Sequence, residues 1–227
     1  MSVLEAAIGW LAPPDCISCG EEGSVLCGRC SESIIKPFGE RCWRCDRLIP
    51  GSRTCESCRH AGPLSHVWIS TTYDHFAQRL VRAYKFGQQR AAAGSISRMM
   101  AQTLRNQSVD LSGLLVVPVP TATSRVRQRG FAHSELLARR IAAAQRLEYL
   151  PALRRLGQTR QLGASREVRL KQLEASFAIR NPKRIAGRKI LLVDDVLTTG
   201  GTLIAASKIL KANGAKEVNA AVFAKRL

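Results

Sequence analysis

The 227-residue sequence predicts an α/β protein, built as a doubly wound parallel sheet that follows a small N-terminal module. Three observations lead to this fold class. Strand and helix patterns alternate after residue 62, which is the order that builds a parallel sheet with helices on both faces. The runs at 113–120 and 189–193 are mostly apolar, as is typical of strands buried on both sides. All eight cysteines lie between residues 16 and 58, so a separate Cys-rich module precedes the sheet.

The first half of the α/β part is predicted to contain two strands and two helices. "HVWISTTYD" (66–74) is rich in β-branched and aromatic residues, which favours a strand. "AQRLVRAYKFG" (77–87) repeats its apolar residues at helical intervals and stops at a glycine, and residues 90–105 also have the pattern of a helix. "GLLVVPVP" (113–120) is a short buried strand that its prolines end.

The second half repeats this alternation. "HSELLARRIAAAQR" (133–146) has one apolar face and predicts a helix. Residues 157–171 are polar and basic, which predicts a mobile loop leading into a short helix. "KILLVDD" (189–195) is the clearest core strand, "TLIAASKILKANG" (202–214) is a helix that ends at a glycine, and "VNAAVFA" (218–224) is the last strand.

Composition and charge narrow the class of protein. No apolar stretch is long enough to cross a bilayer, and the apolar N-terminus lacks the basic start of a signal peptide, so we expect a cytoplasmic protein. The 35 lysines and arginines exceed the 17 acidic residues and give a net charge of +18. This excess favours polyanionic partners such as nucleic acid, an acidic membrane surface or phosphorylated small molecules, although a merely solvated basic surface also accounts for it.

The cysteines form four Cys-x2-Cys knuckles, which are Cys16 and Cys19, Cys27 and Cys30, Cys42 and Cys45, and Cys55 and Cys58. Two residues between thiolates let both sulfurs reach one tetrahedral ion, and four thiolates close a structural site. Eight cysteines therefore predict two structural Zn2+ sites, with residues 1–62 as a double zinc ribbon module and 63–227 as the α/β domain. Disulfides do not suit a reducing compartment, and an iron–sulfur cluster is a further alternative. Adjacent pairing of the knuckles gives shorter loops than crossed pairing, and both stay open.

The segment "LLVDDVLTTGGT" (191–202) has the most informative pattern. Its strand ends at Asp194 and Asp195, whose adjacent carboxylates repel each other but suit the vicinal hydroxyls of a ribose. Ligands of a parallel sheet bind beyond the carboxyl ends of its strands. The next residues lead into a helix, whose first N–H groups can hold phosphate. The small residues of this predicted phosphate cradle are Thr198, Thr199, Gly200, Gly201 and Thr202. The segment predicts a bound sugar phosphate, because a capped helix after an edge strand leaves the two aspartates unexplained.

Four further motifs accompany this segment, namely "YKFG" (84–87), "VPVP" (117–120), "RQRGFAHSELLA" (127–138) and "RQLGASREVR" (160–169). "ILLVDDVLTTGGT" closely resembles the phosphoribosyl pyrophosphate (PRPP) loop of type I phosphoribosyltransferases. With the other motifs, the chain resembles the ComF/GntX family along essentially its whole length. In that family a double zinc ribbon is joined to a phosphoribosyltransferase domain, so the resemblance implies the type I phosphoribosyltransferase fold.

The resemblance also implies a role for each matching residue. Asp194 and Asp195 would hold the ribose hydroxyls, with one of them assisting the chemistry, and residues 198–202 would hold the 5'-phosphate. Pro120 and Thr121 would lie where pyrophosphate and Mg2+ bind. The basic segment 160–169 would be a flexible flap over PRPP, with three candidate cations: Arg160, Arg166 and Arg169.

The chain departs from the family pattern at two of these motifs. The flap lacks the usual asparagine after its arginines, with Gln172 nearby, and the segment 127–138 differs at two positions. The family commonly has Arg-Gly-Phe-Asn-Gln, where this chain has Ala132 and His133 at the last two positions. Losing the two amide side chains removes polar contacts, so a ligand contact at these positions is not expected. We expect His133 to be a surface residue at a helix start rather than a base.

Two functions from different classes fit these residues. Phosphoribosyl transfer needs carboxylates near the sugar and charge stabilisation on the leaving pyrophosphate, and the sequence has both but specifies no acceptor. The rival is a non-catalytic adaptor that binds single-stranded DNA in a groove with steep salt dependence. Its candidate phosphate contacts stand at alternate positions: Arg125, Arg127 and Arg129. The resemblance implies a link to DNA uptake and to a helicase-type ATPase, and PRPP could also be a regulatory ligand of such an adaptor.

Overall fold

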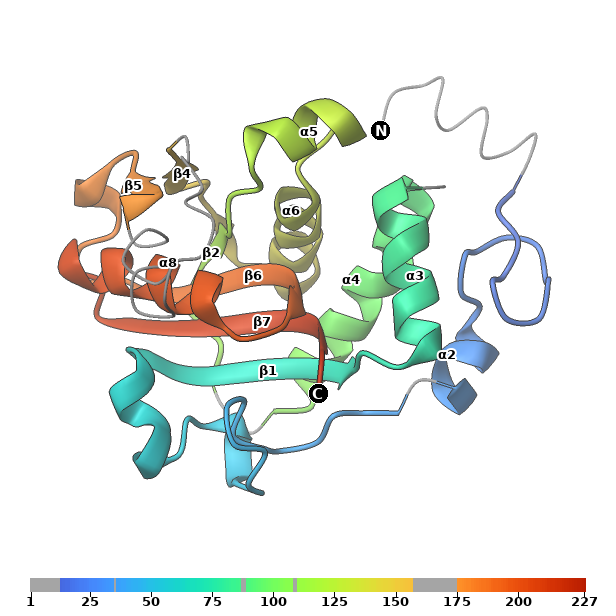
Figure 1. Cartoon of the computed structure of the whole chain (residues 1–227), viewed down its shortest axis with the longest axis horizontal. Coiled ribbons are helices and arrows are strands. Elements are labelled where there is room, and N and C mark those ends of the chain that lie inside the picture. The colour runs from blue at the N-terminus through green and yellow to red at the C-terminus, as the bar shows by residue number, and fades with distance from the viewer. Residues whose placement is uncertain (1–12, 35, 87–88, 108–109, 157–174) are drawn as a thin grey trace, which may run out of the picture.

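The computed structural model describes residues 13–34, 36–86, 89–107, 110–156 and 175–227. Its centre is a five-stranded parallel sheet with the strand order β1-β7-β6-β2-β3 (Figure 1). The strands are Leu64–Thr72 (β1), Leu115–Pro118 (β2), Glu148–Tyr149 (β3), Lys189–Leu197 (β6) and Glu217–Lys225 (β7). The strand that carries the two aspartates, β6, is therefore the middle strand of the sheet.

Helices cover both faces of this sheet, which confirms the predicted doubly wound arrangement (Figure 1). One face carries α3 (His75–Phe86), α4 (Gln89–Arg105) and α6 (His133–Gln145), and the other carries α8 (Gly201–Ala212). The remaining elements are short: α2 (Gly28–Ile34), the 3-10 helices Pro50–Ser52, Glu56–Ala61 and Pro182–Arg184, α5 (Thr123–Arg129), and the antiparallel pair β4 (Leu153–Arg155) and β5 (Phe177–Ile179). No helix of the described residues combines the length and the apolarity that a bilayer span needs.

Strand β6 forms because its side chains are apolar on both faces. Leu191 and Val193 pack into the apolar cluster under α3, α4 and α6, whereas Ile190 and Leu192 pack into the cluster under α8. Successive side chains of a strand point to opposite faces. The strand is predicted over 189–195, and it continues to Leu197, with both aspartates inside it.

The Cys-rich segment packs directly on the α/β part. Leu26, from its first half, shares the apolar cluster of α3 and α4, and Trp43, from its second half, shares the cluster of α8. Isolated bridges join the second half to the edge strand β1, at Pro37 with Thr71 and at Arg53 with His66. The division into domains 1–62 and 63–227 stays a prediction.

Candidate functional site

A cavity of about 400 Å³ opens at the carboxyl end of the sheet, where β6 and β2 end. Asp194, Asp195, Thr198 and Thr202 line it from β6 and the start of α8. Among the described residues, five basic side chains line it as well: Lys85, Arg125, Arg129, Arg155 and Arg226. A cavity with two carboxylates and five cations suits a ligand that combines hydroxyls with several phosphate charges.

The two aspartates reach this cavity from opposite faces of β6. Asp195 shares the face of Val193, and Asp194 shares the face of Leu192. Each carboxylate is held by the backbone of the next residue, since Asp194 Oδ1 accepts from the N–H of Asp195 at 2.9 Å and Asp195 Oδ1 accepts from the N–H of Val196 at 2.7 Å. The side chains are therefore fixed before any ligand arrives.

Asp195 has a direct ionic partner that the sequence reasoning did not single out. Lys85 Nζ, near the end of α3, lies 2.6 Å from Asp195 Oδ2, and the side chains are only 21% and 12% exposed. The signal was present in the motif "YKFG", but a lysine at the end of a helix is more often a surface residue than a site residue. The close pairing that identifies Lys85 exists only in the folded chain.

The environment of Asp194 differs from that of Asp195. Burial and the neighbouring Asp195 carboxylate raise the pKa of Asp194 to about 7, although a backbone hydrogen bond, Lys85 and Arg155 oppose this rise. A carboxyl with such a pKa is divided between its protonated and ionised forms near neutral pH. Asp194 can therefore accept or release a proton at the wall of the cavity.

The predicted phosphate cradle is a tight turn between β6 and α8. Gly200 has a left-handed backbone with φ of 78°, and α8 begins at the next residue without a side-chain cap. Its first turn thus keeps N–H groups that a bound anion can accept from. Thr198 and Thr202 line the cavity. Thr198 and Thr199 are exposed, Gly200 is buried, and Gly201 and Thr202 are half-buried.

The turn after β2 lies at the same cavity. Pro120 and Thr121 line it together with the two aspartates. The pyrophosphate and Mg2+ position that the family resemblance implies for them stays a prediction. Thr121 Oγ1 lies 3.4 Å from Ser134 Oγ, and Ser134 donates to the carbonyl of Val119. Ser134 thereby ties the turn to the start of α6.

Residues 123–129 form the helix α5 rather than an extended basic strip. Positions four apart share a helix face, so Arg125 and Arg129 both line the cavity, and Arg127 is exposed elsewhere on the helix. The structure therefore does not bring the three arginines together on one face. The flap arginines Arg160, Arg166 and Arg169 lie outside the described residues. Arg155, from β4, is a cavity residue that the sequence reasoning missed.

The expectation that His133 is a surface residue is wrong. Its side chain lies at the cavity wall, packs edge-on against Tyr84 with ring centroids 5.0 Å apart, and the residue is only 3% exposed. Burial lowers the pKa of His133 to about 4, and neither ring nitrogen has a hydrogen-bond partner among the described residues. The imidazole is therefore neutral at physiological pH. The rings of Tyr84 and Phe131 pack against the imidazole and contribute to this burial.

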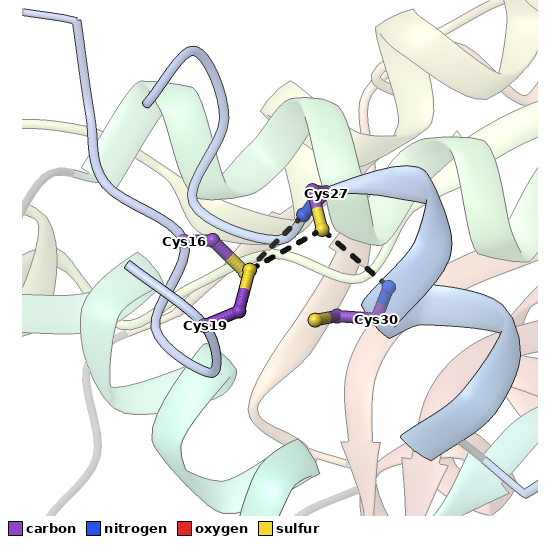
Figure 2. Close-up of side chains that lie close together, drawn as sticks. All are labelled: Cys16, Cys19, Cys27 and Cys30. Carbon is purple, nitrogen blue, oxygen red and sulfur yellow. Dashed lines mark hydrogen bonds between the residues drawn. The ribbon is translucent and has the colours of Figure 1, made fainter. Parts of the chain in front are cut away.

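The eight cysteines gather into two groups of four, as adjacent pairing of the knuckles predicts: Cys16, Cys19, Cys27 and Cys30, then Cys42, Cys45, Cys55 and Cys58. All eight are free thiols. Figure 2 shows the four side chains of the first group pointing toward one another, with backbone N–H groups of Cys27 and Cys30 directed at the sulfurs of Cys16 and Cys27. In each group the four sulfurs lie within 4.8 Å of one another.

These sulfur positions fit a tetrahedral metal ion. Zinc–thiolate bonds of about 2.3 Å place the sulfurs of a tetrahedral site about 3.8 Å apart. The sulfurs of Cys19 and Cys27 are 3.8 Å apart, and those of Cys45 and Cys55 are 3.6 Å apart. Both groups can therefore hold a zinc ion with four thiolate ligands, which leaves no position for a reacting molecule.

Comparisons with known proteins agree with this arrangement. The family model described as the phosphoribosyl transferase domain matches residues 87–227. The chain is 28% identical over 200 residues to competence protein ComFC of Streptococcus pneumoniae, which covers 87% of this chain and 86% of that protein. It is 27% identical over 201 residues to competence protein F of Haemophilus influenzae, with 85% and 87% covered. A shorter match, 41% identical over 59 residues, joins 26% of this chain to 28% of uracil phosphoribosyltransferase of Bifidobacterium longum.

These matches confirm the resemblance seen in the sequence. The matched range 87–227 contains β2, β6, the turn 198–202 and α8, and most of the residues that line the cavity belong to this range. A match over 87% of the chain also reaches into the Cys-rich segment, so the similarity to the competence proteins is not confined to the sheet. The chain belongs to the phosphoribosyl transferase domain family, and within it to the ComF/GntX type with an N-terminal Cys-rich segment.

Proposed function

We propose that this chain binds PRPP with Mg2+ in the cavity at the carboxyl end of the sheet and transfers its phosphoribosyl group to an acceptor. One observation carries the proposal: the two carboxylates of β6 and the turn 198–202 meet at a single cavity that five basic side chains also line. Carboxylates accept hydrogen bonds from the hydroxyls of a sugar, and arginines and lysines bind its phosphates.

Each part of PRPP has a matching group in this cavity. The N–H groups of the first turn of α8, with Thr198 and Thr202, would hold the 5'-phosphate. Asp194 would accept hydrogen bonds from the ribose hydroxyls. Thr121 and the arginines of α5 would hold the pyrophosphate.

The reaction breaks the bond between the anomeric carbon and the pyrophosphate, which leaves with the bonding electrons, while the acceptor forms a new bond to the same carbon. Mg2+ would neutralise part of the charge that develops on the leaving group. Arg125 and Arg129, which line the same cavity, would stabilise the same charge. The acceptor is to be sought in a panel that includes uracil, the base named in one relative.

Calorimetric titration of PRPP with Mg2+ tests the proposal. Asp194→Asn should weaken binding about 10- to 100-fold, because a hydrogen bond to a charged group contributes about 1.5–3 kcal/mol. Asp110→Asn is the matched control, since Asp110 is exposed, lies outside the cavity and, among the described residues, accepts hydrogen bonds only from Ser112. If the wild-type protein does not bind PRPP, or if both variants bind it equally well, the proposed function is wrong.

We also propose that each tetra-cysteine group binds Zn2+ and that residues 1–62 form the zinc ribbon module of a cytoplasmic protein. Four thiolates with tetrahedral spacing support the choice of metal, and eight free thiols suit a reducing compartment.

A role in DNA uptake or utilization is the second proposed function, in which single-stranded DNA and a helicase-type ATPase are partners. The names of the competence proteins and the net charge of +18 support it. Arg127 and Lys183 are exposed outside the cavity, so they are available to phosphate groups of DNA while PRPP occupies the cavity.

A further inference from the structure

The second tetra-cysteine group touches the phosphate cradle through one side chain. Trp43 stands between the ligands Cys42 and Cys45, and it is only 3% exposed. A Cβ added at Gly200 would lie 2.4 Å from Cζ3 of the Trp43 ring, so the ring lies directly against the backbone of the turn. Only glycine leaves room for this contact, and only glycine adopts the φ of 78° without strain.

The Trp43 ring is itself fixed from behind. Its Nε1 donates to Thr54 Oγ1 at 2.9 Å, and Thr54 Oγ1 donates to the carbonyl of Leu64 at 2.7 Å. Thr54 directly precedes the ligand Cys55, and Leu64 begins β1. The indole is therefore held between the two knuckles of the second group and the edge of the sheet, in one orientation.

A second contact joins the same group to the carboxyl end of the sheet. Asp46, directly after the ligand Cys45, forms an ion pair with Lys225 at the end of β7. Lys225 lies opposite Leu197 in the sheet, and the N–H of Arg226 donates to the carbonyl of Leu197 at 2.9 Å. Arg226 lines the cavity. The second group therefore contacts the cradle itself through Trp43, and through Asp46 it contacts the strand that pairs with Leu197, just before the cradle.

The first tetra-cysteine group lies elsewhere. It packs beside α4, where Ser95 Oγ donates to the carbonyl of Leu26 at 3.4 Å. Neither group lines the cavity, but among the described residues the three atoms nearest to a Cβ added at Gly200 all belong to Trp43, and none belongs to residues 13–34, which carry the first group. The two groups have the same ligand chemistry but different positions relative to the cradle.

We propose that the second group is a metal-dependent support of the phosphate cradle: its metal fixes Trp43 against Gly200 and thereby sets the affinity for the 5'-phosphate, whereas the first group does not. This inference rests on the proposed function, in which the turn 198–202 binds that phosphate. A turn that is already held in its binding conformation loses less entropy when the anion arrives. By linkage, phosphate bound at the cradle must also tighten metal binding at the second group.

A pair of tryptophan variants tests the support. Trp43→Phe removes part of the ring that contacts Gly200, and Trp68→Phe is the matched control, because Trp68 is 1% exposed but belongs to the other apolar cluster. The probes are ribose 5-phosphate and inorganic pyrophosphate with Mg2+. Trp43→Phe should weaken ribose 5-phosphate binding about tenfold and leave pyrophosphate binding within about twofold. Trp68→Phe should leave both unchanged. Equal losses for the two ligands, or for the two variants, would overturn the proposal.

Glycine variants test the contact itself. Gly200→Ala introduces the clash with Trp43, whereas Gly187→Ala has a similar φ of 74° and open space around the added methyl group. Gly200→Ala should weaken ribose 5-phosphate binding more than Gly187→Ala does. Trp43→Leu removes the clash, so in that background Gly200→Ala should weaken ribose 5-phosphate binding less than it does in the wild type. An equal loss of ribose 5-phosphate affinity in both backgrounds would contradict the proposed contact.

Hydrogen exchange separates this inference from the proposed function. Cys45→Ser and Cys19→Ser each remove an exposed ligand, one from the second group and one from the first. In the absence of PRPP and ribose 5-phosphate, the amides of residues 199–203 should exchange faster in Cys45→Ser than in Cys19→Ser. Zinc release is measured in both variants, so that the loss of metal is known for each. If the wild-type protein binds neither PRPP nor ribose 5-phosphate, the proposed function fails while the exchange result still decides the support. Equal exchange of these amides in the two variants excludes it.

Discussion

The ion pair between Lys85 and Asp195 fixes one carboxylate of the cavity in place. Their charged atoms are 2.6 Å apart and mostly shielded from water, so removing either partner would leave a buried charge uncompensated. The pair fixes Asp195 on one face of β6. Asp194, on the other face, has its pKa raised to about 7 by burial and by the Asp195 carboxylate. Two adjacent aspartates therefore have different chemical environments, and Asp194 is the one suited to exchange a proton.

The raised pKa of Asp194 makes a prediction about stability. In the unfolded chain an aspartate has a pKa of about 3.9, so between about pH 4 and about pH 7 the folded state binds more protons than the unfolded state. The free energy of unfolding should therefore decrease as pH rises through this window and then level off. Asp194→Asn removes this cost and should raise Tm at pH 8, where a gain of about 1 kcal/mol corresponds to about 2–4 °C.

Thermal unfolding of the wild type and Asp194→Asn across this pH range measures the effect. The difference in Tm between the two proteins should grow toward neutral pH and be small near pH 4. A difference that does not change with pH would mean that Asp194 does not titrate as its burial implies. The same variant should lose PRPP affinity, so the residue would favour binding at the expense of stability.

At the scale of elements, patterning predicted the long strands and helices well. The apolar runs at 64–72, 189–197 and 217–225 and the helical repeats of α3, α4, α6 and α8 all form at or close to their expected positions. The elements β3, β4 and β5 were missed because each has only two or three residues and gains its order from the neighbours it pairs with. Alternation of apolar and polar side chains needs more residues than these to be recognised.

The site was predictable where one continuous segment supplies it and not where distant elements meet. Asp194, Asp195 and the turn 198–202 are recognisable because strand, acids and helix start follow one another in the chain. Lys85 and Arg155 come from separate elements, and only the tertiary fold brings them to the cavity. The alternate spacing groups Arg127 with Arg125 and Arg129, but the segment is a helix, on which residues two apart lie on different faces.

Helix α5 gives a prediction that separates the two proposed functions. Arg125 lines the cavity and Arg127 does not, although both are exposed arginines two residues apart. Arg125→Gln should weaken PRPP binding about tenfold, since it removes a hydrogen bond between charged groups, and Arg127→Gln should leave it unchanged. Arg127→Gln should instead lower single-stranded DNA affinity and reduce its salt dependence by about one phosphate contact. Calorimetry with PRPP and salt-dependent DNA titration measure the two effects. Equal losses of PRPP affinity in both variants would contradict the assignment of Arg125 to the cavity.

At the scale of the whole molecule, the Cys-rich segment is part of the core. Leu26 and Cys30 belong to the apolar cluster of α3, α4 and α6, and Phe38 and Trp43 belong to the cluster of α8. Both faces of the sheet are therefore completed by residues that precede β1. A module that only adjoined the sheet would have its own core and would leave these clusters intact when it unfolds.

This shared core predicts how the protein responds to loss of metal. A structural zinc bound by four thiolates contributes on the order of 10 kcal/mol to folding, so removing both ions should unfold the Cys-rich segment. Because that segment covers both apolar clusters, the sheet should lose stability with it, and calorimetry should show one transition shifted to lower temperature. Far-UV circular dichroism at the same temperatures should follow that single transition, and restoring Zn2+ should reverse the shift. If the metal-free protein instead keeps a transition at the original temperature, residues 63–227 fold without the segment, and the two parts are independent domains.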